Sequence, residues 1–104
     1  MNSIRLRSAI AFFSLALPLC AAEYITYIGT SGANSKGIYA FRFNSKSGKL
    51  DSLGLVAETP RPSFVALHPN KRYLYAVAEA NGGAVSAFSI DARTGKLTLL
   101  NTVS

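Results

Sequence analysis

A segment of the chain occurs twice, about 47 residues apart, and this repeat limits the fold more than any other feature. The sequence Ser-Gly-Lys-Leu at 47–50 returns as Thr-Gly-Lys-Leu at 94–97. The apolar residues Ile38, Ala40, Phe41, Phe43 and Leu53 correspond at the same offset to Val85, Ala87, Phe88, Ile90 and Leu100. Upstream, 27–29 aligns with 75–77 at an offset of 48. A repeat of this length predicts structurally equivalent units that stack on one another.

Each copy is predicted to consist of short strands, because short apolar runs alternate with turn residues. The expected strands of the second copy cover 62–67, 73–78, 84–90 and 97–103, and those of the first cover 24–29, 37–43 and 50–57. No segment after residue 22 shows helical periodicity. The sequence therefore indicates an all-β chain of antiparallel strands.

Three turns carry specific backbone expectations. Gly48 in the turn at 44–49 is expected to have a positive φ, which other residues resist. In the turn that begins His68-Pro69-Asn70, Asn70 is expected to tolerate a left-handed backbone. The prolines at 60 and 62 should end the strand before them, because each removes a backbone donor.

Four short strands that repeat every 40 to 50 residues are typical of β-propeller blades. We predict a β-propeller fragment of antiparallel four-stranded blades, preceded by a signal peptide. Residues 1–22 are the signal peptide, 23–58 an incomplete first blade that begins at its second strand, and 59–104 a complete second blade. Propellers have about four to eight blades, so we expect a longer parent protein, whose C-terminal end could supply the missing strand and remove an exposed sheet edge.

The N-terminal segment has the layout of a secretory signal peptide. Arg5 and Arg7 precede an apolar run at 9–19, and small residues follow it at 21–22, so cleavage is predicted before Glu23. The run is too short to span a bilayer. The predicted location is periplasmic or secreted, without stable membrane insertion after cleavage.

Cys20 allows an alternative, because a cysteine just after an apolar run can be acylated. The bulky Leu19 before it argues against this lipoprotein interpretation, since bacterial lipoprotein signals favour a small residue there. If Cys20 leaves with the signal peptide, the mature chain has no cysteine and no disulfide.

The charge pattern argues against nucleic-acid binding. The formal net charge is +6, but most basic residues stand singly in predicted turns, where lysine and arginine are usually solvated. The glycine-bearing segment 30–37 lacks phosphate-loop and dinucleotide spacing. No cluster has metal-ligand spacing, and no serine lies in a nucleophile elbow. The sequence predicts no cofactor and no metal.

Several stretches together resemble a known family. They are Tyr-Ile-Gly-Thr at 27–30, Gly-Ile-Tyr-Ala-Phe-Arg-Phe at 37–43, the segment from Pro62 to Val77, and Gly-Ala-Val-Ser-Ala-Phe-Ser-Ile-Asp at 83–91. They are similar to the N-terminal portion of seven-bladed lactonase propellers, which include bacterial 6-phosphogluconolactonases and fungal carboxymuconate-lactonizing enzymes. The family often carries asparagine where this chain has Arg61 and Ala78. In its lactonizing members the chemistry is attributed to later blades.

The resemblance implies that ligands meet the mouth of a central channel, reached here by the loops at 30–36, 59–63 and 79–83. Arg61 and Glu79 are the candidate substrate-binding residues. Arginine offers a bidentate fork for phosphate or carboxylate, and a carboxylate can position water as a general base. Each also has a structural interpretation, Arg61 as a solvated loop cation and Glu79 as a partner of nearby backbone. His68 is expected at the opposite end of the inner strand, in a structural role.

Three hypotheses of function follow. The leading one is an exported lactonase that hydrolyses a sugar-derived lactone, with a small-molecule lactone or sugar phosphate as its partner. The two predicted blades alone would be inactive, because the remaining blades are needed for closure. The alternative is a secreted propeller that binds or scaffolds without catalysis. A third is a chain whose open edges pair with other chains.

Overall fold

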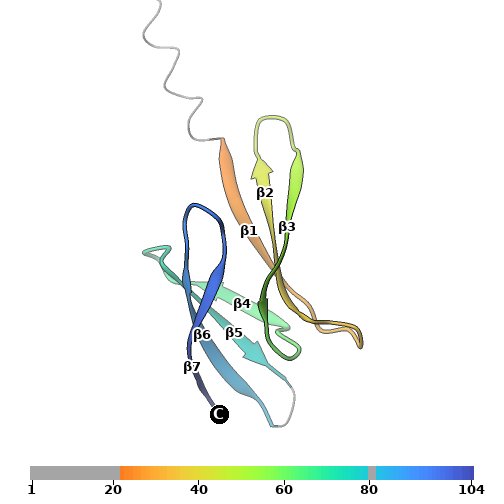
Figure 1. Cartoon of the computed structure of the whole chain (residues 1–104), viewed down its shortest axis with the longest axis vertical. Helices are drawn as coiled ribbons and strands as arrows, with labels where there is room; N and C mark the ends of the chain where they lie inside the picture. The colour runs from red at the N-terminus through yellow and green to blue at the C-terminus, as the bar shows by residue number, and fades with distance from the viewer. Residues whose placement is uncertain (1–21, 80–81) are drawn as a thin grey trace, which may run out of the picture.

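The computed structural model describes residues 22–79 and 82–104, which form seven strands in two antiparallel sheets (Figure 1). The first sheet contains, in spatial order, β1 (Glu23–Gly29), β2 (Gly37–Asn44) and β3 (Leu50–Glu58). The second contains β4 (Phe64–Leu67), β5 (Tyr73–Ala78), β6 (Ala84–Ile90) and β7 (Leu97–Val103). The described residues include no helix, so the all-β prediction is confirmed.

The strands lie where the sequence predicted them, within two residues at each end. Only β4 begins later than expected, at Phe64 rather than at Pro62, because proline has no N–H for the ladder. In the described part of the chain the first sheet has three strands, with β1 at its edge. Of the predicted signal peptide only Ala22 is described, so Cys20 lies outside the described residues.

The pairing register confirms the internal repeat. Tyr27 pairs with Ala40 in the first sheet, and Tyr75 pairs with Ala87 in the second. Tyr75 lies 48 residues after Tyr27, and Ala87 lies 47 residues after Ala40. The pairing therefore reproduces the offsets found in the sequence. Irregular register also occurs at the same place in both sheets, after Ala40 and after Ala87. The two sheets are thus two copies of one structural unit.

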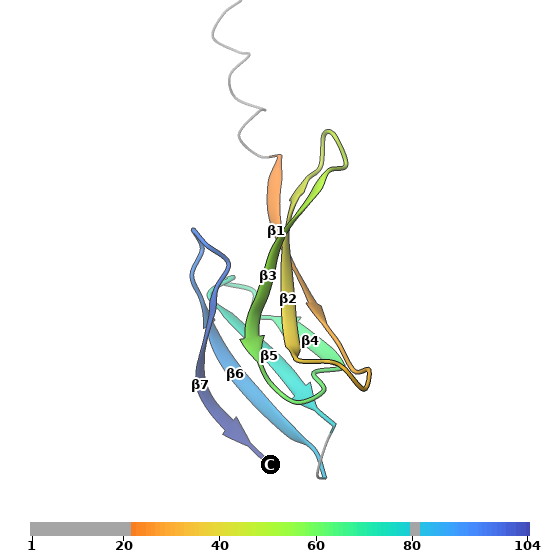
Figure 2. The ribbon, with the colours of Figure 1, turned by 45° about the vertical axis from the view of Figure 1, so that its right-hand side comes forward.

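The two sheets pack face to face, and the core lies between them (Figure 2). Ile38, Ala40 and Val56 of the first sheet contribute to it, and Leu74, Ala76 and Phe88 of the second. Ile38 and Leu74 are completely buried. Because burying one such side chain stabilises a protein by about 1.5–3 kcal/mol, this small core is what holds the two units together.

The turns at 44–49 and 91–96 share one hydrogen-bond pattern. Asn44 Oδ1 accepts hydrogen bonds from the N–H groups of residues 46 and 47, at 2.9 and 3.1 Å, and Asp91 Oδ1 accepts those of residues 93 and 94, at 2.9 and 3.4 Å. The glycine N–H then donates to the carbonyl of residue 44 or 91. Gly48 has a φ of 79° and Gly95 one of 82°, which confirms the positive φ predicted for Gly48.

The prediction for Asn70 is wrong. The left-handed residue of this turn is Lys71, with a φ of 64°. Asn70 instead uses its side chain, because Oδ1 accepts the Arg72 N–H at 2.8 Å. This hydrogen bond closes the turn around Lys71. Lys71, and not Asn70, therefore adopts the left-handed backbone conformation.

Gly29, at the end of β1, contacts the connection between the sheets very closely. A Cβ atom added to Gly29 would lie 2.0 Å from the carbonyl oxygen of Pro62. Only glycine permits this approach, so the sequence of β1 fixes where the chain crosses from the first sheet to the second.

No helix among residues 22–79 and 82–104 is long and apolar enough to cross a bilayer.

Candidate functional site

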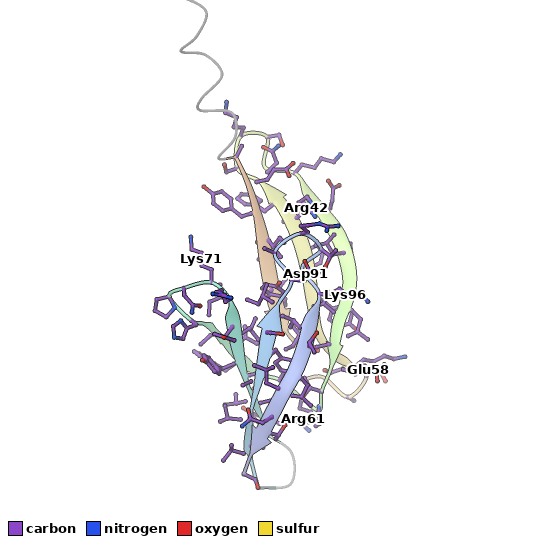
Figure 3. All side chains as sticks on the ribbon, turned by 60° about the vertical axis from the view of Figure 1, so that its left-hand side comes forward. Arg42, Glu58, Arg61, Lys71, Asp91 and Lys96 are labelled. Atoms are coloured by element: carbon purple, nitrogen blue, oxygen red, sulfur yellow. The ribbon has the colours of Figure 1, made fainter. Side chains whose placement is uncertain are left out.

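The three loops at 30–36, 59–63 and 79–83 gather at one end of the two sheets, as predicted, although 80–81 are not described; we call this the loop end. The Thr59 N–H donates to the Lys36 carbonyl at 3.2 Å. The Glu79 N–H donates to the Arg61 carbonyl at 3.5 Å. Arg61 lies at this end, away from Lys71 and Arg42 (Figure 3).

The backbone of Arg61 is strained. Its φ is 46°, a region that residues with a Cβ rarely adopt, and the next residue is the buried Pro62. Such a conformation costs about 1–3 kcal/mol, and strained residues cluster at functional sites. Asparagine would tolerate this region better than arginine does. The Arg61 side chain is exposed, so its charge is available to a ligand.

Glu79 is held by a residue that the sequence analysis did not single out. Ser63 Oγ donates to Glu79 Oε2 at 2.6 Å. This is the length of a hydrogen bond to an ionised carboxylate, and it fixes the orientation of an exposed side chain. Ser63 and Glu79 both lie in loops that were predicted to face a ligand, and only this shared location could have indicated the pair.

Three hollows adjoin the loop end. One of about 350 Å³ is lined by Lys36, Glu58 and Thr59 with Ser35 and Pro60. A second, of about 450 Å³, is lined by Glu79 together with apolar residues of β5, β6 and β7. A third, of about 440 Å³, is lined by residues 58–60 and by residues of β5, β6 and β7. Arg61 lines none of the three. The structure therefore joins Arg61 and Glu79 through the backbone, but it does not bring their side chains to one cavity.

His68 lies at the other end of β4 from Arg61, as predicted. Its Nδ1 accepts the Asn70 N–H at 3.1 Å, and its ring meets the Tyr73 ring edge-on with centroids 5.9 Å apart. Both contacts stabilise the turn after β4. These contacts support the structural role expected for His68.

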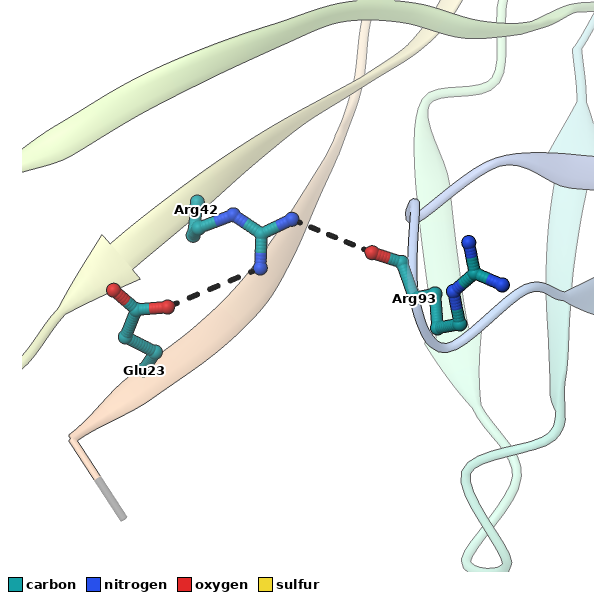
Figure 4. Close-up of polar contacts among 3 residues, drawn as sticks. All are labelled: Glu23, Arg42 and Arg93. Carbon is teal, nitrogen blue, oxygen red and sulfur yellow. Dashed lines mark hydrogen bonds and ion pairs between the residues drawn. The ribbon is translucent and has the colours of Figure 1, made fainter. Parts of the chain in front are cut away.

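At the end that carries the turns, polar contacts cross from the first sheet to the second. Tyr27 Oη donates to the Gly95 carbonyl at 2.8 Å. Arg42 Nη2 donates to the Arg93 carbonyl at 3.5 Å, while within the first sheet Arg42 Nη1 lies 3.9 Å from Glu23 Oε1 (Figure 4). The sequence analysis missed these contacts, because nothing in a single strand shows which turn will face it.

Two pKa values are shifted at this end. Burial, and to a smaller extent the Asp91 carboxylate, raise the pKa of the Tyr27 phenol. The backbone N–H groups of Arg93 and Thr94 lower the pKa of Asp91. These shifts accompany structural hydrogen bonds, so they do not mark an acid–base pair for catalysis.

The described residues contain no group of three or more His, Cys, Asp or Glu that could hold a metal ion. The polar groups at the loop end include serine and threonine hydroxyls, an asparagine, carboxylates, a lysine and an arginine. This set suits an anionic or hydroxylated small molecule.

Residues 25–104 match the model of a known family, described as lactonase, 7-bladed β-propeller. The chain belongs to this family. The match extends over all seven strands apart from the first residues of β1. Two packed antiparallel sheets built on one repeat are two neighbouring blades of such a lactonase propeller.

Relatives of this lactonase propeller carry a more specific name. The chain is 38% identical over 81 residues to the 6-phosphogluconolactonase of Bacillus subtilis, covering 76% of this chain and 23% of the relative. It is 43% identical over 68 residues to the 6-phosphogluconolactonase of Formosa agariphila, covering 62% and 19%. The chain thus spans about a quarter of the length of these relatives.

A solved structure shows the same similarity. The two blades superpose on a candidate 6-phosphogluconolactonase from Bacteroides fragilis with a TM-score of 0.73 and 40% identity. The superposition covers 79% of this chain and 24% of that one. Sequence and structure comparisons therefore agree on the family.

Proposed function

We propose that these residues belong to a lactonase that hydrolyses a sugar-derived lactone of the 6-phosphogluconolactone type. The observation that carries the proposal is the similarity to two relatives named 6-phosphogluconolactonase, at 38% and 43% identity. In the reaction, a water oxygen bonds to the ring carbonyl carbon and the bond between that carbon and the ring oxygen breaks. The ring oxygen takes a proton and becomes a hydroxyl, and the product is an open-chain acid.

The loop end offers two groups suited to this reaction. Glu79, oriented by Ser63, is the candidate base that takes a proton from the attacking water. Arg61 is the candidate partner of the substrate's phosphate, because guanidinium binds phosphate through two parallel hydrogen bonds. In this proposal other blades complete the channel and supply further catalytic groups, so the two blades described here are inactive alone.

The direct test is lactone hydrolysis by the whole protein that contains these residues. Glu79→Gln is expected to lower kcat by about 10²- to 10⁴-fold, the usual contribution of a general base. Arg61→Asn is expected to raise KM for a phosphorylated lactone about tenfold or more, and to leave KM for the unphosphorylated lactone unchanged. His68→Asn, at the opposite end of β4, is the control and should keep both constants. No acceleration over buffer by the unmodified protein would overturn the proposal.

We also propose export, because the N-terminal segment has the layout of a signal peptide. The measurement is the N-terminal sequence of the protein recovered from outside the cytoplasm, with Glu23 as the expected first residue. Recovery of the protein only from the cytoplasm with its first residues intact would contradict export. An acylated Cys20 at the N-terminus would instead support the lipoprotein alternative.

Export favours one second candidate, a propeller that binds a ligand without catalysis, since a phosphorylated sugar lactone is a cytosolic compound. The kinetic test above separates the two functions. A binding propeller would bind a lactone or sugar phosphate with a measurable Kd and would not hydrolyse it. Glu79→Gln would then change Kd little, whereas Arg61→Asn would weaken binding.

A further inference from the structure

The hollow of about 440 Å³ lies between the two sheets, and we call it the inter-sheet hollow. Residues 58–60, which end β3 and follow it, line one side, and residues of β5, β6 and β7 line the other. The second side belongs to the face that packs on the first sheet, because it includes the core residue Phe88. Figure 2 shows these two sheets facing each other. Both walls are therefore described residues, and further blades of a ring would stack on the outer faces of the sheets, away from this hollow.

The internal repeat is interrupted at two residues that line this hollow. In the first sheet, Tyr39 lies directly across from Leu55. Their counterparts at the offset of 47 are Ser86 and Thr102, which lie directly across from each other in the second sheet. Both of these residues line the inter-sheet hollow. A tyrosine and a leucine are thus replaced by two smaller residues with hydroxyl groups, which leaves both space and polar atoms at this place.

The two hydroxyl groups form a polar patch on the wall of the hollow. Ser86 Oγ and Thr102 Oγ1 are hydrogen-bonded to each other at 2.9 Å. Ser86 is only 4% exposed, whereas Thr102 is exposed. Their bond uses one of the two hydroxyl protons, so the other proton and the remaining lone pairs are available to a ligand. Because polar groups that lose water need hydrogen-bond partners, this wall favours a ligand that carries hydroxyl groups.

The charge of the hollow selects a neutral ligand. Glu58 is the one charged residue among those that line it, all of which the structure describes. A carboxylate repels a phosphate or a second carboxylate, and no lysine or arginine of this lining compensates the repulsion. The same carboxylate accepts strong hydrogen bonds from hydroxyl groups. The inter-sheet hollow therefore suits an uncharged, hydroxylated molecule, unlike the neighbourhood of Arg61.

The rest of the lining is mainly apolar. It includes Phe88, Leu99, Ala78, Ala84 and Pro60. Small-molecule sites usually have volumes of about 300–1,000 Å³ and combine apolar walls with a few placed polar groups, and the inter-sheet hollow meets both conditions. A sugar ring has matching surfaces, because its faces carry C–H groups and its edge carries hydroxyls. The size and the lining therefore fit one sugar ring.

We propose that the inter-sheet hollow binds an uncharged sugar of a single ring. The C–H groups of the sugar contact Leu99, and its hydroxyls bond to Thr102 and Glu58. Ser86 orients the Thr102 hydroxyl through their hydrogen bond. The site is separate from Arg61, which does not line the hollow, so this proposal does not rest on lactone hydrolysis.

The test is the binding of D-glucose to the whole protein that contains these residues, measured by saturation-transfer NMR. The unmodified protein is expected to bind glucose saturably. Thr102→Val keeps the shape of the side chain and removes its hydroxyl, so it should raise the Kd about two- to tenfold, the effect of one neutral hydrogen bond. Thr98→Val makes the same change in the same strand at a residue outside the hollow. This matched control should leave the Kd unchanged.

A second pair of variants fills the hollow with the residues that the first sheet carries at the equivalent positions. Ser86→Tyr should abolish glucose binding, with circular dichroism to show that the sheets are intact. Thr102→Leu fills the hollow from an exposed position, so it replaces Ser86→Tyr if that variant does not fold, and it should also abolish binding. In an Arg61→Asn background, which removes the nearby cation of the loop end, glucose 6-phosphate should bind at least fivefold more weakly than glucose.

Three results would overturn the proposal. The first is the absence of saturable glucose binding by the unmodified protein. The second is an equal effect of Thr102→Val and Thr98→Val on the Kd. The third is glucose binding that is lost in Arg61→Asn and kept in Thr102→Leu, because it would place the sugar at the loop end. Each result is independent of whether the protein hydrolyses a lactone, so the two proposals can fail separately.

Discussion

The turns at 44–49 and 91–96 have the same local structure in different surroundings. Both close with the same hydrogen bonds and a glycine near a φ of 80°. The turn at 91–96 packs against the first sheet and accepts a hydrogen bond from Tyr27, whereas nothing lies within 4 Å of the Cβ position of Gly48. Six residues of sequence are therefore enough to specify the turn, and only the neighbouring sheet decides whether it contributes to packing.

The largest test of this comparison concerns the aromatic pair Phe88 and Phe41, which occupy equivalent positions in the two sheets. Phe88 is 2% exposed in the core, and Phe41 is half-buried on the outer face of the first sheet. Phe88→Ala is expected to lower the free energy of unfolding by about 3–5 kcal/mol. Phe41→Ala should cost about 1–2 kcal/mol, since less apolar surface is lost. Urea denaturation measures both, and equal losses would contradict the assignment of the core.

The next test compares the loss of stability caused by Gly48→Ala with that caused by Gly95→Ala. Gly48→Ala should cost about 1 kcal/mol, the penalty for a Cβ in left-handed backbone. Gly95→Ala carries the same penalty and adds a contact of 3.2 Å to Leu53, so we expect a total of about 2–3 kcal/mol. Thermal unfolding of the two variants gives the difference. A larger loss of stability from Gly48→Ala than from Gly95→Ala would contradict the assignment of the turn at 91–96 as the packed one.

A smaller effect is expected for the tyrosine hydroxyls. Tyr27→Phe removes the hydrogen bond to the Gly95 carbonyl and should cost about 0.5–1.5 kcal/mol. Tyr75→Phe should change the free energy of unfolding by no more than a few tenths of a kcal/mol, as is usual for a surface substitution. The pKa of Tyr27 is raised, so its stabilising contribution is complete below about pH 10 and is lost as the pH rises through its folded-state pKa. Tyr27→Phe should remove this alkaline dependence, and its persistence would assign it to another group.

The smallest expected change in stability concerns Asp91, which takes the place in its turn that Asn44 takes in the other. Asp91 and Asn44 accept equivalent hydrogen bonds, so Asp91→Asn should change stability little at neutral pH. The pKa of Asp91 is lowered, and its contribution is therefore present above the unfolded value of about 3.9 and is lost as the pH falls through the folded-state pKa. The variant should lose less stability than the unmodified chain between neutral and acid pH, as measured by urea denaturation. Identical acid dependence in both chains would exclude a role for Asp91.

The strands and turns were predictable because local residues determine them. Apolar residues alternate in β5 and β6, which predicts strands, and the glycines at 48 and 95 predict tight turns. The internal repeat supports both assignments, because each occurs in the two copies. The left-handed residue after Pro69 was assigned to Asn70 rather than Lys71, because the sequence does not show that the Asn70 side chain is used in a hydrogen bond.

The site was less predictable than the fold. The sequence placed Arg61 and Glu79 in neighbouring loops, but the hydrogen bond from Ser63 to Glu79 depends on how far apart the ends of β4 and β5 lie. The contacts of Arg42 and Tyr27 with the turn at 91–96 depend on the stacking of two sheets. Such contacts between units are fixed by the distance and rotation between neighbouring blades, which no single strand encodes.

The close approach of Gly29 to Pro62 also has a mechanical consequence. The end of β1 rests on the peptide that leads into β4, with no side chain between the two backbones. A hinge motion that opened the loop end would have to separate these backbones first and would carry Arg61, the residue before Pro62, along with them. The contact between Gly29 and Pro62 therefore couples the position of Arg61 directly to the end of β1.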